Sequence, residues 1–503
     1  MQFGPNSTPE EIENALRRSA QERYGADRAA ALDGRLKNTA RWTALIGAAP
    51  VDFATDPPDQ VGLDGGSLSI PRHDLPITDV ASRIRERELS ATDMVRSHFE
   101  RIDHLDPQVQ AWVVLDRERA LQRANELDVR AGRGEFLPLH GVPFGVKDII
   151  DVAGLPTGAG FPPYRDRTAE KDAAVVARLR ALGAIPLGKT HTTQFAFSDP
   201  APTTNPYDLT RTPGGSSSGS AAAVSAQMVP LALGTQTAGS VLRPAAYCGV
   251  VGFKPTYNWF SRDGVLPLAW SLDHLGLLTG NVADAALVYG ALLGIDVATA
   301  HRPVPPRIGF VQDFLERSAP DVAEHLNSVR GELVTAGATV TSIKLPLDLD
   351  LLLAVHHLIM QIEVASVHGE QVARMRDSYG PAVPADTDVG QLVPATYDVK
   401  ARRLRGSLGR IIDTLFEEYD ALILPTASNV APARALGSTG DRTFQAPGSL
   451  LGLPAISLPL GIGTDSMPIG TQLIGRRGDD ARLLSLAAWV EAAIGLIPPP
   501  SFE

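Results

Sequence analysis

The sequence predicts an α/β fold in which helices cover a β-sheet, with a helical extension in front of it. Three observations lead to this prediction. Residues 7–47 carry two helical patterns before any strand pattern appears. Residues 171–190 alternate a helical pattern with a short apolar strand, and residues 421–493 hold three buried strand patterns and a closing helix. The 503 residues suffice for one large hydrophobic core or two moderate ones.

Residues 1–49 are predicted to form an N-terminal helical hairpin. Ser7 or Thr8 is its expected N-cap, because acidic residues follow in the first turn. Its apolar side chains need a surface to cover, on the main domain or on a neighbouring subunit, so a homodimer is one assembly that the hairpin allows. These side chains are Ile12, Leu16, Leu32, Leu36, Trp42, Leu45 and Ile46. Residues 50–74, rich in Pro, Gly and Asp, are predicted to be an extended linker.

Residues 75–503 are predicted to form one folded domain. Its expected helices span residues 78–88, 90–105, 117–131, 171–183, 284–293, 321–336, 351–379, 397–419 and 479–493. Its expected strands span residues 139–150, 184–190, 307–312, 339–345, 421–426, 454–460 and 470–475. Residues 380–395, which contain Pro and Asp, are predicted to be a loop that shapes specificity.

Composition narrows the class of ligand. A net charge of −11 argues against nucleic acid and anionic membranes as partners, because both require a basic face. No run of about 18 strongly apolar residues indicates a membrane span, and the N-terminus lacks the pattern of a signal peptide, so the expected location is cytoplasmic. The single cysteine, Cys248, excludes an internal disulfide framework and a cysteine-built zinc site. A small-molecule substrate without a metal or other cofactor is the remaining expectation.

The segment from Pro213 to Pro255 is the most informative stretch. Its glycines and serines are interleaved with apolar residues, whereas a flexible linker stays polar throughout. Small-residue turns inside a core suggest that backbone N–H groups are aimed at an anion or a developing oxyanion. Ser240 directly follows such a turn, residues 234–239, and is the predicted nucleophile.

Lys147 is the predicted base. It is a lone lysine in an otherwise apolar strand pattern, and lysine can lose its proton when buried, whereas arginine cannot. Lowering a lysine pKa from about 10.4 to about 7–8 corresponds to about 4 kcal/mol, which burial among apolar groups provides. A neutral Lys147 would accept the proton of a serine hydroxyl.

These motifs resemble a known family. Lys147 in GVKD, the PGGSSSGSA turn with Ser216, and GTQTAGS with Ser240 followed by RPAAYCGVVGFKPT closely resemble the amidase signature family of serine hydrolases, over about residues 75–495. The resemblance implies a central mixed β-sheet covered by helices on both faces. It also implies a Ser-Ser-Lys triad of Ser240 as nucleophile, Ser216 as the bridging serine with a cis peptide, and Lys147 as base.

The resemblance assigns further roles. The backbone N–H groups of residues 237–240 are expected to form the oxyanion hole; these residues are Thr237, Ala238, Gly239 and Ser240. Gln194, Phe195 and Gln236 are the expected substrate-binding residues. The family usually has Asp-x-Gly-Gly-Ser here, so Gln236 and Ala238 are departures, and Ala238 would cost about 1 kcal/mol or more if its φ had to be positive. The implied activity is hydrolysis of an amide C–N bond, with a carbamate, urea, ester or aryl amide as other substrates.

The same residues also allow other interpretations. Gly215–Gly219 matches G-x-S-x-G, which would make Ser217 the nucleophile of an α/β-hydrolase, but the preceding NPYDLTRT is polar and not the strand that such an elbow requires. Lys189 is a rival base. The chain could also be a silent binding relative, or an amidotransferase subunit that releases ammonia from glutamine for a partner enzyme.

Overall fold

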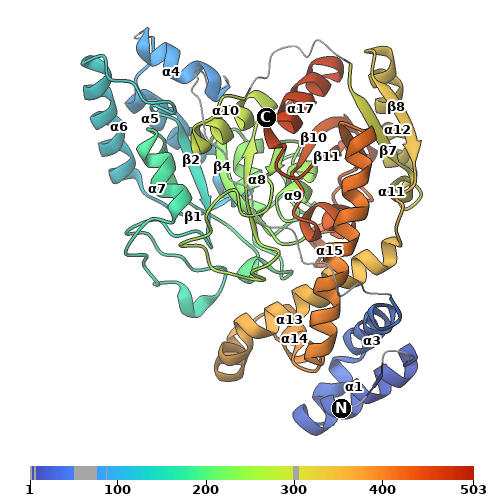
Figure 1. Cartoon of the computed structure of the whole chain (residues 1–503). Coiled ribbons are helices and arrows are strands. Elements are labelled where there is room, and N and C mark those ends of the chain that lie inside the picture. Colours follow the sequence, from blue (N-terminus) through green and yellow to red (C-terminus); the bar gives the residue numbers. More distant parts are fainter. Residues whose placement is uncertain (1–2, 5–6, 50–75, 87, 298–304, 503) are drawn as a thin grey trace.

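The computed structural model describes residues 3–4, 7–49, 76–86, 88–297 and 305–502 of the chain (Figure 1). Its centre is one eleven-stranded sheet with the strand order β1-β3-β2-β4-β6-β5-β10-β11-β9-β7-β8. The strands are β1 (Trp112–Leu115), β2 (Pro143–Lys147), β3 (Ile185–Thr190), β4 (Leu231–Gln236), β5 (Val251–Lys254), β6 (His274–Thr279), β7 (Arg307–Val311), β8 (Thr339–Ile343), β9 (Ala421–Pro425), β10 (Ala455–Ile462) and β11 (Pro468–Ile474).

The sheet is mixed. Strand β2 runs parallel to β3 and β4, and β7 runs parallel to β8 and β9, whereas the other neighbouring strands are antiparallel. Its central strands β2, β4 and β6 are buried at every position, as expected for strands that are covered on both faces. The predicted mixed sheet flanked by helices, with a helical N-terminal extension, is therefore confirmed.

Seventeen α-helices accompany the sheet within the described residues. They are α1 (Pro9–Tyr24), α2 (Ala26–Ala31), α3 (Asp33–Ala48), α4 (Ile77–Arg85), α5 (Ala91–Val109), α6 (Arg117–Gly132), α7 (Ala174–Ala181), α8 (Ser218–Ser225), α9 (Leu242–Tyr247), α10 (Val282–Leu293), α11 (Gln312–Leu315), α12 (Pro320–Thr335), α13 (Leu349–Met375), α14 (Ala382–Gly390), α15 (Ala395–Glu418), α16 (Ala446–Leu450) and α17 (Asp480–Ile494).

One predicted loop is a helix. Residues 380–395 contain α14, all nine residues of which are buried, so the prediction of a loop was wrong there. Pro and Asp indicated a loop, but the two aspartates are held by arginines of other elements, which a local pattern does not reveal. Strands β1, β4, β5 and β6 were not predicted from the sequence either.

Helix α3 of the N-terminal extension packs against α13, α14 and α15 of the main body, and α1 packs against α3 (Figure 1). Thr8 caps α1 in a reciprocal capping box with Glu11, as the sequence indicated. Ile12, Leu16 and Leu36 are fully buried in a cluster that includes Val389 of α14. The apolar face of the extension is therefore covered by the same chain. The predicted linker, residues 50–74, lies outside the described residues.

Two ion pairs join the extension to α14. Arg35 pairs with Asp386 at 2.7 Å, and Arg28 pairs with Asp388 at 2.8 Å. Arg376 also pairs with Asp388, at 2.6 Å, and the Asp388 side chain is only 2 % exposed. The extension is thus held by buried carboxylates as well as by apolar contacts.

Asp388→Ala is expected to lower the free energy of unfolding by about 1–3 kcal/mol, because it leaves two arginines without their shared buried carboxylate. Both arginines are about a third exposed, which keeps the effect below that of a fully buried pair. Denaturant unfolding measures it. Glu370→Ala is the control, since the Glu370–Arg374 pair is exposed and should change stability by less than about 0.5 kcal/mol. Equal effects of the two variants would contradict this account.

One helix among the described residues, spanning Leu349–Ser378, is long and apolar enough to cross a membrane. In its most apolar stretch of 18 residues, 67 % is buried inside the protein, as in a helix that packs in a protein core. Its length and composition are therefore weak evidence for a membrane span.

Candidate active site

The strand order explains why Lys147 and the serine turns meet. Strands β2 and β4 are parallel neighbours, with Val146 opposite Leu233. Their carboxyl ends therefore emerge at the same edge of the sheet, which is where α/β proteins place their ligands. Lys147 ends β2, and Ser240 lies four residues after the end of β4. Ser216 precedes α8, which contacts both strands.

The Lys147 amine lies among oxygen atoms of these turns. Its Nζ is 2.8 Å from Ser216 Oγ and 3.0 Å from Ser217 Oγ. It is also 2.8 Å from Thr235 Oγ1 and 3.3 Å from the Thr235 carbonyl oxygen. A neutral amine has two N–H groups and one lone pair, so it can donate to Thr235 and accept from the Ser216 hydroxyl.

Burial favours this neutral state. The Lys147 side chain is 0 % exposed, and burial holds the pKa of its amine well below the ordinary value of 10.5. The negative charge of Asp273 opposes the shift and the positive charge of Arg243 adds to it. Among the described residues, no carboxylate lies within ion-pair distance of Lys147.

Lys189 is equally buried but has a different environment. Its Nζ is 3.1 Å from the Asp148 carboxylate and 2.9 Å from Thr157 Oγ1. Burial lowers the pKa of the Lys189 amine below the ordinary value of 10.5, and the negative charge of Asp148 opposes this shift. Lys189 is therefore a structural member of a buried ion pair, whereas Lys147 faces serine hydroxyls. This arrangement argues against Lys189 as the base.

Hydrogen bonds tie the Ser216 turn to the Ser240 turn. The peptide bond between Gly215 and Ser216 is cis. The Ser217 N–H donates to the Ser240 carbonyl at 3.2 Å, and Arg243 donates to the Gly215 carbonyl at 2.5 Å. Arg243 also donates to the Gly440 carbonyl at 3.0 Å, so its guanidinium is held by backbone carbonyls. The two serine-bearing turns are thus fixed relative to each other.

Gln236 supports the turn that follows β4. Its side-chain oxygen accepts hydrogen bonds from the N–H groups of Val241, at 2.9 Å, and Leu242, at 3.0 Å. Its amide nitrogen donates to Ser449 Oγ at 3.0 Å. Ala238 is not among the residues with positive φ, so its side chain adds no left-handed strain. Both departures from the usual motif are compatible with an ordered turn.

Asp273 holds the other side of this turn. Its carboxylate accepts from Thr237 Oγ1 at 2.6 Å and from the N–H groups of Leu268 and Ala269, at 2.8 and 3.0 Å. Burial raises its pKa to about 6. The carboxylate of the Ser271–Gly276 segment therefore caps backbone donors next to the nucleophile turn.

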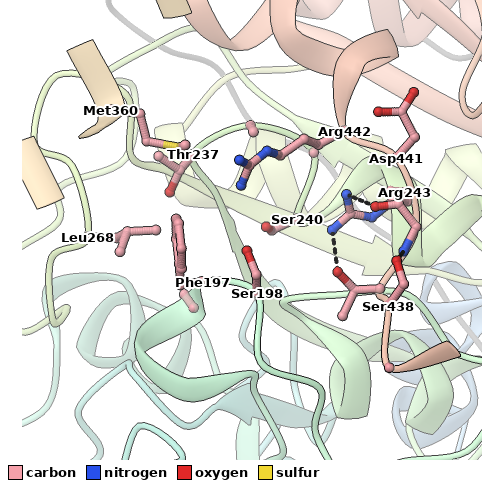
Figure 2. A pocket seen from close by; sticks show the side chains of 16 residues that line it. Phe197, Ser198, Thr237, Ser240, Arg243, Leu268, Met360, Ser438, Asp441 and Arg442 are labelled. Carbon is pink, nitrogen blue, oxygen red and sulfur yellow. Dashed lines mark hydrogen bonds between the residues drawn. The ribbon is translucent and has the colours of Figure 1, made fainter. Parts of the chain in front are cut away.

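A cavity of about 290 Å³ opens above Ser240 (Figure 2). The described residues that line it are Ala196, Phe197, Ser198, Thr237, Ala238, Gly239, Ser240, Arg243, Leu268, Met360, Gly437, Ser438, Thr439, Gly440, Asp441 and Arg442. The lining thus contains the whole turn of residues 237–240. It combines apolar side chains with arginines, which suits a small molecule that has both apolar and polar parts.

The three predicted substrate-binding residues do not line this cavity. Gln194 accepts from the Gly380 N–H at 2.8 Å and donates to the Gly160 carbonyl at 3.3 Å. Phe195 packs in an aromatic cluster, 4.9 Å from the Phe161 ring. Gln236 is fully buried, and its side chain bonds to the Val241 and Leu242 N–H groups and to Ser449. The structure places Phe197 and Ser198 at the cavity in their stead.

Other polar groups near the site were not singled out from the sequence. Thr235 contacts Lys147 directly, and the only local signal was a threonine at the end of an apolar strand. Arg442 lines the cavity from more than 200 residues beyond Ser216, and no local pattern marked it. Cys248, in contrast, is buried with its Sγ 3.4 Å from the Pro213 carbonyl, in keeping with a structural role.

Sequence comparison identifies relatives over most of the chain. The amidase family model matches residues 93–484. The glutamyl-tRNA(Gln) amidotransferase A subunit of Thermus thermophilus is 34% identical over 464 residues, covering 82% of this chain and 96% of the relative. The protein of the same name from Koribacter versatilis is 32% identical and covers 82% and 97%.

Solved structures show the same likeness. A crystal structure of an amidase superposes with a TM-score of 0.75 at 31% identity, covering 82% of this chain and 99% of that chain. The peptide amidase of Stenotrophomonas maltophilia gives a TM-score of 0.74 at 29% identity, covering 85% and 98%. A chain from a vestigial protein complex, linked to the origins of an s-triazine catabolic enzyme, gives 0.77 at 29% identity, covering 84% and 99%.

Proposed function

The chain belongs to the amidase family and is an amide C–N hydrolase, and from this premise we propose that Ser240, Ser216 and Lys147 form its catalytic triad. Ser240 is the nucleophile, Ser216 relays the proton, and Lys147 is the base. The substrate is a small molecule that contains an amide or a related C–N bond.

The observation that carries this proposal is the environment of Lys147. A fully buried amine without an ion-pair partner among the described residues lies 2.8 Å from a serine hydroxyl. Such an amine is neutral at moderate pH because a buried charge without a partner is costly. It therefore has a lone pair available for the Ser216 proton, and Ser216 in turn can accept a proton from Ser240.

The reaction then follows from these groups. Ser240 Oγ attacks the carbonyl carbon while its proton passes through Ser216 to Lys147. The N–H groups of residues 237–240 stabilise the negative oxygen of the tetrahedral intermediate. The relay returns the proton to the leaving nitrogen, the C–N bond breaks, and an amine and an ester on Ser240 result. Water, deprotonated by the same relay, hydrolyses the ester and releases the acid.

Glutamine hydrolysis for a transamidating partner is the second candidate. The names of the curated relatives favour it over a stand-alone hydrolase, because they are subunits of an amidotransferase. The solved neighbours named as amidases favour the stand-alone activity. Both functions use the same bond-breaking step and differ in the substrate and in the fate of the nitrogen.

A substrate panel distinguishes the two candidates. Purified protein is incubated with glutamine, aliphatic amides, an anilide and a carbamate, and ammonia and aryl amine are measured separately. A stand-alone amidase should hydrolyse at least one non-glutamine amide more efficiently than glutamine. Glutamine as the only good substrate would contradict a stand-alone amidase for other amides and favour the amidotransferase alternative.

A further inference from the structure

A second cavity adjoins the one above Ser240. Its volume is about 180 Å³, and it shares Phe197, Ser198 and Arg442 with the first. Its outer wall comes from helix α3 of the N-terminal extension. The α3 residues in this wall are Arg35, Asn38 and Trp42. The family match begins at residue 93, so this wall is an addition to the part of the chain that the family describes.

Arg442 stands at the junction of the two cavities and has no carboxylate within ion-pair distance among the described residues. Its guanidinium contacts His357 Nε2 at 2.9 Å and lies 5.6 Å from the centre of the Phe197 ring. Burial holds the pKa of His357 well below 6.5, so this ring is neutral and accepts the hydrogen bond without balancing the charge. A half-buried guanidinium is thus left without a counter-ion.

The nearby carboxylates are engaged elsewhere. Asp386 pairs with Arg35 at 2.7 Å. Asp441 accepts from the Thr443 N–H at 3.0 Å and from Thr443 Oγ1 at 2.7 Å, and Figure 2 shows its carboxylate pointing away from the cavity. The other arginine of the first cavity, Arg243, donates to backbone carbonyls. The two joined cavities therefore contain more positive than negative charge.

We propose that Arg442 binds a carboxylate of the substrate, so that this enzyme prefers amides with an anionic group at the end remote from the scissile bond. The inference rests on the proposed function of Ser240. The amide carbonyl lies over the turn of residues 237–240, the chain of the substrate passes Phe197, and its carboxylate meets Arg442 beside the wall formed by α3. A guanidinium binds a carboxylate with two parallel hydrogen bonds, which fixes the orientation of the substrate.

The apolar part of this path suits a short carbon chain. The Trp42 and His357 ring centroids lie 3.9 Å apart at an interplanar angle of 31°, and both rings line the second cavity together with Phe197. Trp42 belongs to the extension and His357 to α13, so the extension completes the subsite.

The experiment compares acids with matched neutral amides. Succinamate and glutaramate carry one amide and one carboxylate, and succinamide and glutaramide replace that carboxylate by an uncharged group of the same shape. The wild type is expected to hydrolyse at least one of the acids with a higher kcat/KM than its diamide. In Arg442→Gln, kcat/KM for that acid should fall by about 10- to 100-fold, with less than about a threefold change for the diamide.

Arg434→Gln is the matched control, because Arg434 is an exposed arginine of the same connection that lines neither cavity. It should leave the acid-to-diamide ratio unchanged. An equal fall for acid and diamide in Arg442→Gln would show a general structural defect and overturn the proposal. A wild type that prefers the diamides would overturn it as well.

A binding measurement separates this inference from the proposed function. Calorimetry with the Ser240→Ala protein detects succinamate and glutaramate without turnover. Weaker binding of the acid after the additional Arg442→Gln change supports the subsite even if Ser240 proves not to be the nucleophile. Unchanged binding, or no binding of either acid to the Ser240→Ala protein, overturns the subsite whatever the outcome for Ser240.

Discussion

Ser240→Ala is expected to reduce kcat by about 10⁶-fold, because no acyl-enzyme can form without the nucleophile. The remaining groups of the site would stay in place, since Ser240 lies in a turn fixed by Gln236 and by the Ser217 N–H. Substrate binding should therefore change little while turnover is lost. Steady-state kinetics measures the loss of turnover, the mass of the intact protein after brief exposure to a slow substrate shows whether an acyl-enzyme forms, and calorimetry measures binding.

A fluorophosphonate probe gives a second readout of the same variant. The wild type should gain one covalent adduct and Ser240→Ala none. Ser438→Ala is the matched control, because Ser438 lines the same cavity but has no proposed part in proton transfer, and it should keep the adduct. Labelling that persists in Ser240→Ala would move the nucleophile to another serine, with Ser217 of the G-x-S-x-G motif as the first to examine.

Lys147→Met is expected to lower kcat by on the order of 10⁴-fold, because the relay loses its proton acceptor. Methionine fills similar space without an amine, so the free energy of unfolding should change much less than the activity. Lysine is not replaceable by arginine here, since a guanidinium holds its proton, and Lys147→Arg should be as inactive.

Lys189→Met is expected to lower the stability of the protein and not the activity of its folded fraction. It breaks the buried pair with Asp148, so the free energy of unfolding should fall by about 3–5 kcal/mol, while the folded fraction keeps a functioning relay. Activity of Lys147→Met close to that of the wild type, or a loss in Lys189→Met larger than its unfolding explains, would contradict the assignment of the base.

Local patterns in the sequence predicted most helices and strands of the main body. The long helices α13 and α15 and the buried strands β3, β9, β10 and β11 have clear periodicity or apolar runs. Strands β4, β5 and β6, which were not predicted, lack a clear alternating pattern and owe their form to pairing with neighbouring strands of the sheet. Helix α14 was mistaken for a loop because its aspartates are balanced by residues about 350 positions away.

The residues of the candidate site likewise fall into those that the sequence predicted and those that it did not. Lys147 and Ser240 stood out because a lone lysine and small-residue turns are unusual within apolar runs, and the family resemblance added Ser216. Gln194, Phe195 and Gln236 were assigned from the family resemblance, but a resemblance does not reveal whether a side chain of this chain faces the cavity or a backbone amide. Arg442 lies about 200 residues after Ser240 in the sequence, and only the tertiary structure brings it to the cavity. No local sequence pattern therefore predicted its position.

The ionisation of Lys147 is tested most directly by the pH dependence of the rate at which the fluorophosphonate labels Ser240. A neutral Lys147 accepts the proton, and burial holds its pKa well below 10.5. The labelling rate should therefore rise with pH through this lowered pKa, reach a plateau well before pH 10.5, and lose this dependence in Lys147→Met. A rise centred near 10.5, or the same rise in Lys147→Met, would contradict the account.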